Sequence, residues 1–129
     1  MTEAAEATRL AAHPGARAAV AAAFFANGLV SGSWALLVPV ILARLGITES
    51  DVGLLILAGG SAGFLGLLAA PRAIGYFGSR AVCVAAGLAL APALLIMAAA
   101  PSYPLAGLAF VYLFLALSVM DVAMNANGS

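Results

Sequence analysis

The chain has 129 residues, of which 65% are hydrophobic and only 8% are charged. Soluble domains carry about a quarter charged residues, so this composition excludes a water-exposed globular enzyme. Five arginines balance five acidic residues, and the resulting net charge of zero gives no sign of nucleic-acid binding. The one cysteine cannot form an internal disulfide, and no residues have metal-ligand spacing, so we expect no metal and no cofactor. The composition indicates an integral membrane protein in a lipid bilayer.

Charged residues divide the chain into long apolar stretches, and a proline-rich turn at residues 100–104 divides the longest of them. A helix that crosses a membrane needs about 20 apolar residues. The stretches are continuous rather than alternating, which favours helices over the strands of a barrel. We therefore predict an all-α membrane protein with a polar tail at residues 1–17 and, within residues 18–129, four transmembrane helices at Ala18–Leu42, Val52–Ala70, Ala81–Ala99 and Leu105–Met124.

The arginines predict how these helices are oriented. Arg9 and Arg17 precede the first helix, and Arg72 and Arg80 lie between the second and the third. Arg44 is the one arginine in the other loops. Because cytoplasmic loops of membrane proteins are enriched in arginine and lysine, the N-terminal tail and the loop at residues 71–80 are expected in the cytoplasm.

Several short signals mark where helices begin, end or bend. Pro14 and the glycine after it are expected to stop any helical structure in the tail. Residues 48–51 read Thr-Glu-Ser-Asp, which is a plausible capping box for the second helix. Pro39 is expected to kink the outer end of the first helix, and Pro92 to bend the third.

The first helix carries two stripes of chemically distinct residues. Asn27, Ser31 and Trp34 recur at helical spacing and share one face, which makes them candidates for lining a substrate cavity. The alternative is structural, with Asn27 as a hydrogen-bonding strut and Trp34 as a packing residue. Gly28 and Gly32 form a neighbouring stripe with the small-residue spacing of close helix contacts.

The second helix shows the same small-residue spacing. Gly59, Gly63 and Gly66 lie on one face, and glycines at this spacing let two membrane helices approach closely. No lysine or hydroxyl residue follows them in the register of a phosphate-binding loop. The pattern therefore predicts helix packing rather than nucleotide binding.

The fourth helix supplies the one acidic residue that we expect inside a span. Asp121 and Asn125 share a face near its end, which the orientation above places close to the inner surface. An ionisable residue in a span is a candidate functional residue, here for an inner gate or a coupling proton. The alternative is an ion pair or a cap, with Arg80 or Arg72 as partner.

An ordered set of these residues resembles the start of a major facilitator superfamily transporter, in particular the bacterial inner-membrane permeases that are distantly similar to fucose–proton symporters. The similarity is carried by Asn27-Gly28, Trp34-Ala35 and Pro39, by Leu45-Gly46 and Gly53-Leu54, by Gly78-Ser79-Arg80, and by the run from Asp121 to Gly128. It covers residues 17–129. It implies the first part of an N-terminal six-helix half, located in the bacterial inner membrane with the N-terminus in the cytoplasm.

The chain departs from the family in two ways. The family's loop between helices two and three reads approximately Gly-x-x-x-Asp-Arg-x-Gly-Arg-Arg, whereas here Pro71, Gly75, Tyr76 and Ser79 replace four of those residues, including the Asp. Gly78 and Arg80 remain. The second departure is length, because such transporters resemble two six-helix halves built from three-helix repeats. We therefore interpret the chain as an N-terminal portion whose remaining helices are missing.

The leading hypothesis is a secondary transporter that moves a small solute by alternating access, with a proton as the candidate coupling ion. One alternative is a self-contained four-helix exporter that dimerises; such exporters keep a Glu in the first helix, and the first helix here has no acid. Another is a non-transporting membrane scaffold. No nucleophile–base pair or carboxylate pair is recognisable in any span, so we expect no enzyme.

Overall fold

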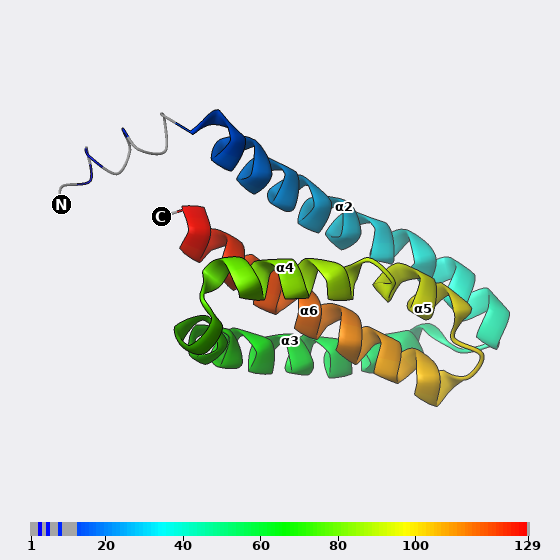
Figure 1. The fold of residues 1–129 in the computed structure, drawn as a ribbon. Coiled ribbons are helices and arrows are strands. Elements are labelled where there is room, and N and C mark those ends of the chain that lie inside the picture. The colour runs from blue at the N-terminus through cyan, green and yellow to red at the C-terminus, as the bar shows by residue number, and fades with distance from the viewer. Residues whose placement is uncertain (1–2, 4, 6–7, 9–12, 129) are drawn as a thin grey trace.

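The computed structural model describes residues 3, 5, 8 and 13–128. Its labelled helices are α2 (Pro14–Leu45), α3 (Glu49–Phe77), α4 (Ser79–Leu90), α5 (Ala93–Ala99) and α6 (Tyr103–Gly128) (Figure 1). Because α4 and α5 together form one span, four segments are long and apolar enough to cross a membrane. The prediction of an all-helical protein with four such segments is confirmed, and the described residues include no strand.

The first span begins earlier than the sequence predicts. Pro14 lies in the first turn of α2 and begins the helix instead of stopping one. Proline suits this place because a first-turn residue has no helical partner for its N–H. The helix thus begins four residues before the predicted Ala18, while the cytoplasmic tail at residues 1–17 remains a prediction, and Arg9 of that tail lies outside the described residues. At the other end, α2 continues through Pro39 to Leu45 and ends at Gly46.

A capping box opens α3, as the sequence predicts. The Oδ2 atom of Asp51 accepts a hydrogen bond from the Thr48 N–H at 2.9 Å. In return the Thr48 Oγ1 atom accepts from the Asp51 N–H at 3.2 Å. The two residues thus satisfy backbone donors that the first helical turn would leave without partners.

The predicted end of the second span at Ala70 is wrong, because α3 continues through Pro71 to Phe77. A proline removes one helical hydrogen bond, and a long arginine side chain can extend along the helix to the membrane surface. Neither Pro71 nor Arg72 therefore has to end the helix. The expected loop at residues 71–80 contracts to Gly78, whose φ of 83° is a conformation that favours glycine.

Pro92 interrupts the third span, in agreement with the predicted bend. α4 ends at Leu90, and α5 begins at Ala93 after a two-residue turn. The hydroxyl of Tyr112, on α6, donates a hydrogen bond to the carbonyl of Ala89 just before the interruption. A side chain from a neighbouring helix therefore satisfies a backbone carbonyl at the break.

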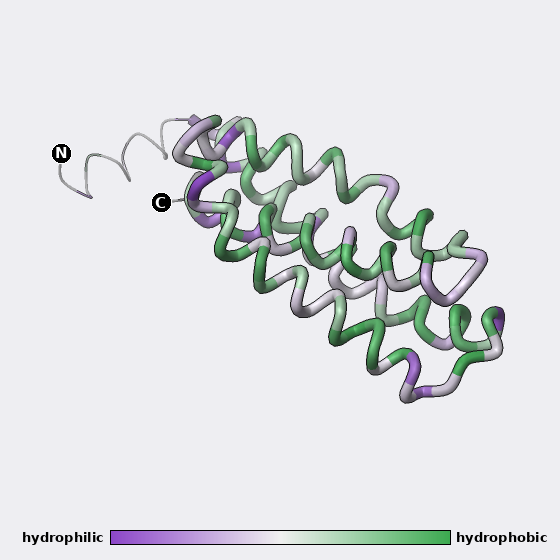
Figure 2. The backbone as a smooth tube through the Cα atoms, turned by 90° about the horizontal axis from the view of Figure 1, so that it is seen from below, coloured by the Kyte–Doolittle hydropathy of each residue, from purple (hydrophilic) through white to green (hydrophobic). Residues whose placement is uncertain are grey.

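α6 is the helix around which the others pack, because it contacts α2, α3, α4 and α5. It runs in the direction of α3 and opposite to α2 and α4 (Figure 1). Its buried side chains include Phe110, Leu113 and Met124. Hydrophilic segments gather at the two ends of the bundle, whereas the middle is mostly hydrophobic (Figure 2). This distribution fits a bundle that lies across a membrane.

Candidate functional site

One face of α2 packs against the rest of the bundle. The half-buried residues Ala23, Val30 and Trp34 contact the hydrophobic core, and Asn27 lies on the same face at helical spacing and is half-buried. Ser31 lies off this face and is exposed. The structure therefore separates the three predicted cavity residues, placing Asn27 and Trp34 toward the bundle and Ser31 outside it.

Trp34 brings α2 against α6 through aromatic contacts. Its ring centroid lies 5.1 Å from that of Phe114 and 6.1 Å from that of Phe110, both in edge-to-face geometry. The two phenylalanine rings are stacked at 6.2 Å. Such pairs are favourable because the positive edge of one ring meets the negative face of another. The three rings anchor the middle of α2.

Asn27 carries the unusual polar atom of this interface. Among the residues that the structure describes, its Oδ1 atom is the one buried side-chain oxygen or nitrogen without a hydrogen-bond partner. A buried acceptor without a donor costs about 1–3 kcal/mol. A donor group would satisfy this atom, but the atom is buried, so a change in helix packing has to expose it first.

The contacts of Trp34 also fix the level of Asn27 in the bundle. Asn27 lies two turns nearer the start of α2, about 10 Å along the axis at 1.5 Å per residue. Since α6 runs in the opposite direction, this displacement corresponds to the part of α6 just beyond Phe114, close to Asp121. The predicted cavity residue and the predicted coupling residue thus lie at similar levels.

The predicted inner-gate residues gather at one end of the bundle, where α3 and α6 end and α4 begins (Figure 1). Asp121, Asn125, Arg72 and Arg80 are all exposed there. The Asn125 side-chain amide donates to the carbonyl of Asp121 at 2.9 Å, within α6. Within the described part of the chain, no ion pair joins Asp121 to either arginine.

The glycine stripe of α3 lies directly against α6. A Cβ atom added at Gly59 would come within 2.9 Å of the Phe114 ring, and one added at Gly63 within 2.9 Å of the Ser118 hydroxyl. At Gly66 an added Cβ would lie 3.2 Å from the Leu115 side chain. Phe114 therefore contacts Trp34 on one helix and the glycine stripe on another.

The glycine stripe of α2 has a different setting. Gly28 and Gly32 are exposed, and apart from the neighbouring residues and backbone of α2 itself no atom of the described chain lies within 4 Å of a Cβ added at either position. The four described spans therefore give these two glycines no packing partner. Their predicted role in helix packing remains a prediction, which would need a contact with another segment.

The opposite end of the bundle holds contacts that the sequence analysis did not anticipate. The Arg44 guanidinium, near the end of α2, donates to the carbonyl of Ala98 and, at 2.6 Å, to that of Ala100. The Tyr103 hydroxyl donates to the carbonyl of Asp51 at 3.1 Å. An arginine near the end of a helix can cap the C-terminus of that helix or of another one. The sequence gives no signal that Arg44 caps α5.

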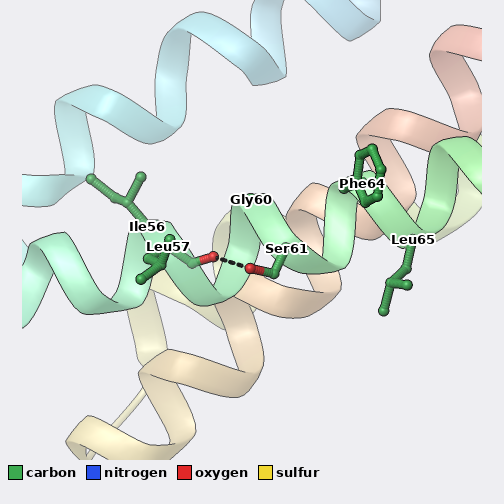
Figure 3. Close-up of a pocket in the computed structure, with 6 residues that line it drawn as sticks. All are labelled: Ile56, Leu57, Gly60, Ser61, Phe64 and Leu65. Carbon is green, nitrogen blue, oxygen red and sulfur yellow. Dashed lines mark hydrogen bonds between the residues drawn. The ribbon is translucent and has the colours of Figure 1, made fainter.

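One surface hollow of the bundle lies along α3 and is apolar. The hollow on α3 is lined by Ile56, Leu57, Gly60, Ser61, Phe64 and Leu65 (Figure 3). All six come from one helix, and the Ser61 hydroxyl donates to the Leu57 carbonyl of that helix at 2.8 Å. No group of three or more potential metal ligands occurs among the described residues. This hollow therefore offers apolar contact and no free polar group.

The four apolar spans and the exposed apolar side chains define a multi-pass helical membrane protein. An uncharacterised MFS-type transporter of Yersinia pestis is 36% identical over 106 residues, which cover 80% of this chain and 27% of that protein. The membrane protein MosC of Rhizobium meliloti is 34% identical over 113 residues, which cover 83% of this chain and 26% of that protein. The chain is thus an MFS-like membrane protein.

The chain spans about a quarter of the length of these two curated relatives. No family model and no solved structure matches it.

Proposed function

We propose that the chain is part of a secondary transporter of the bacterial inner membrane, which moves a small solute by alternating access. The similarity to an MFS-type transporter supports the transport class, and the greater length of both relatives supports the presence of further helices in the whole protein. The predominance of arginine at the end where α2 begins and α4 begins supports a cytoplasmic N-terminus.

The main support for a solute site in this part of the protein is the buried Oδ1 atom of Asn27, which has no hydrogen-bond partner. It lies on the face of α2 that also presents Trp34 to the aromatic rings of α6. An amide acceptor near an aromatic surface suits a small solute with a hydrogen-bond donor and an apolar part. Asp121, at a similar level, is the candidate for coupling to a proton.

A transport assay tests this proposal. The nucleotide sequence beyond the Ser129 codon gives the full product of the native gene, which is reconstituted in vesicles and screened for solute-dependent uptake with and without a proton gradient. We expect Asn27→Ala and Trp34→Ala to lower uptake at least tenfold, because each removes a contact with the solute. Asp121→Asn should abolish the stimulation by the gradient.

Ser61→Ala is the matched control. It removes a hydroxyl group from a span, but this hydroxyl already donates to a carbonyl of its own helix. Its uptake should equal that of the wild type. Wild-type uptake by Asn27→Ala, Trp34→Ala and Asp121→Asn would contradict the site. A full product that moves no solute but purifies with a partner protein would favour a scaffold.

A further inference from the structure

The two halves of α2 differ in how much of their surface packs against the bundle. In residues 34–45, one face contacts the hydrophobic core through the buried Ile41 and the half-buried Trp34, Leu37, Val38 and Leu45. In the described residues 14–27, none is fully buried, and Ala23 is the hydrophobic residue that packs against this core. Membrane helices are held together mainly by close packing and hydrogen bonds. Residues 34–45, the anchored half, are therefore attached more firmly than residues 14–27, the starting half.

The polar and aromatic contacts of α2 show the same asymmetry. In the anchored half, Arg44 donates to two carbonyls at the end of α5, and Trp34 packs against two rings of α6. In the starting half, the Oδ1 atom of Asn27 is buried without a partner. A buried acceptor gains a hydrogen bond when water or another donor reaches it, so this contact favours separation from the bundle. In Figure 1, α2 diverges from α4 toward its start, whereas its end lies beside α5.

The segment between the two halves is well suited to bending. Residues 28–33 read Gly-Leu-Val-Ser-Gly-Ser, with two glycines and two serines in six positions. Glycine weakens a helix because it has no Cβ atom to restrict the backbone, and sharp bends in helices occur at Gly/Ser pairs. A Cβ atom added at Gly28 or Gly32 would meet no neighbouring segment of the described chain. No close helix contact in this part of the protein therefore requires glycine at either position.

Pro39 is the other place where α2 could bend, but it lies within the anchored half, between Trp34 and Arg44. A bend at Pro39 would separate Trp34 from the rings of α6 or Arg44 from the carbonyls of α5. A bend at residues 28–33 leaves both contacts in place and moves the half of the helix with fewer contacts. The contacts of α2 therefore favour a bend before Trp34.

We propose that residues 28–33 are a hinge, about which the starting half of α2 pivots between a position against the bundle and a position apart from it. The anchored half stays fixed. In the position apart, the Oδ1 atom of Asn27 is exposed and accepts a hydrogen bond from water. The inference goes beyond the proposed function, because it concerns the motion of one helix and does not require that a solute is moved.

Distances between spin labels in the full gene product, reconstituted in lipid nanodiscs, test the proposal. In a Cys83→Ala background, one pair of labels at Ala18→Cys and Gly75→Cys reports on the starting half. A second pair at Val40→Cys and Ser50→Cys reports on the anchored half, and all four positions are exposed. A bend of about 20° moves residue 18 by about 6 Å, because it lies about 18 Å from the middle of the hinge. We expect two distances that differ by about this amount for the first pair, and one distance for the second.

Substitutions of the glycines locate the hinge. The double variant Gly28→Ala/Gly32→Ala should reduce the first pair to one distance, because alanine stiffens the helix and has open space at both positions. Gly60→Ala is the matched control in α3, where the added methyl group also has open space, and it should keep both distances. Pro39→Ala should keep both distances as well. The second pair should be unchanged in every variant.

A single distance for the first pair in the wild type overturns the proposal, and it is also the result expected if another helix of the full product holds the starting half in place. Two distances that persist in the glycine double variant overturn it too, because the bend then lies elsewhere. Loss of one distance in Pro39→Ala would assign the bend to the proline. The wild-type comparison of the two pairs remains decisive if a variant does not fold. Two distances in a product without uptake would contradict the proposed function alone.

Discussion

Arg44 joins the end of α2 to the end of α5. Ile41 is the one fully buried residue of α2 in the described structure, and Trp34 contacts the rings of α6 near the middle of the helix. Arg44 donates to two carbonyls that the last turn of α5 leaves without helical donors. Hydrogen bonds to a charged group in a protein are worth more than neutral ones, so Arg44 strengthens the attachment of α2 at this end of the bundle.

We predict that Arg44→Gln lowers the free energy of unfolding by about 1–2 kcal/mol, because hydrogen bonds to a charged donor are lost. Unfolding by sodium dodecyl sulfate, followed by circular dichroism, measures the change. Arg44→Lys should recover only part of the loss, since an ammonium group lacks the planar set of donors. Arg17→Gln serves as the control for charge, and an equal loss there would contradict the specific role of Arg44.

Some of these single-residue contacts could be predicted from sequence and others could not. Thr48 and Asp51 lie three residues apart, so their reciprocal hydrogen bonds follow from local spacing. Arg44 and Ala100 are separated by 56 residues, and nothing local to either one identifies its partner. The stripe containing Asn27 and Trp34 was recognisable, but its contact with Phe114 depends on how two helices pack.

At the scale of helices, the contact between α3 and α6 depends on the absence of side chains along one stripe of α3. Gly59 lies where a Cβ atom would meet both the Phe114 ring and, at 3.2 Å, the Phe110 carbonyl. The ring could rotate away, whereas the backbone carbonyl could move only with its helix. Gly60 is the next residue and has open space around it.

We predict that Gly59→Ala lowers the free energy of unfolding by about 1–3 kcal/mol, because the added methyl group forces α3 and α6 apart. Gly60→Ala is the matched control. It should be neutral or stabilise by up to about 1 kcal/mol, because alanine favours the helix more than glycine does. Denaturation of both variants in the same detergent compares them, and equal effects would show that the close contact is unimportant.

The helix boundaries show a different limit of sequence reasoning. The number of spans follows from four long apolar segments, and it was predicted correctly. The end at Ala99, before the proline-rich turn, was predicted correctly. Two ends were misplaced, at Pro14 with Arg17 and at Pro71 with Arg72. A membrane helix can hold a proline in its first turn, and it can hold an arginine whose side chain extends to the membrane surface. Such residues therefore show roughly where a helix ends, but they do not give the exact residue.

For the whole molecule, the charges at the two ends of the bundle predict its orientation. In the described chain, Arg17, Arg72 and Arg80 lie at the end with Asp121, whereas Arg44 lies at the other end with Glu49 and Asp51. The end richer in arginine is the one expected in the cytoplasm. We therefore predict a cytoplasmic N-terminus for α2, which begins there.

Cysteine labelling in whole cells checks this orientation. In a Cys83→Ala background, Ser50→Cys should react with a membrane-impermeant maleimide, because it lies at the end of the bundle that is predicted to be outside. Gly75→Cys, where no neighbouring atom limits the added side chain, should react only after the cells are opened. The reverse pattern would show that the N-terminus is outside, and Arg72 and Arg80 would then meet the outer leaflet.

The central position of α6 also bears on biosynthesis. Helices enter the membrane in chain order, so α2 to α5 are inserted before the helix that contacts all of them has been made. Until α6 arrives, the glycine stripe of α3, the aromatic face of Trp34 and the carbonyl of Ala89 lack the partners that they have in the finished bundle. A nascent chain that ends before Tyr103 can already join α2 to α5 through Arg44, but it lacks the helix that contacts all the others, so complete assembly of this region waits for α6.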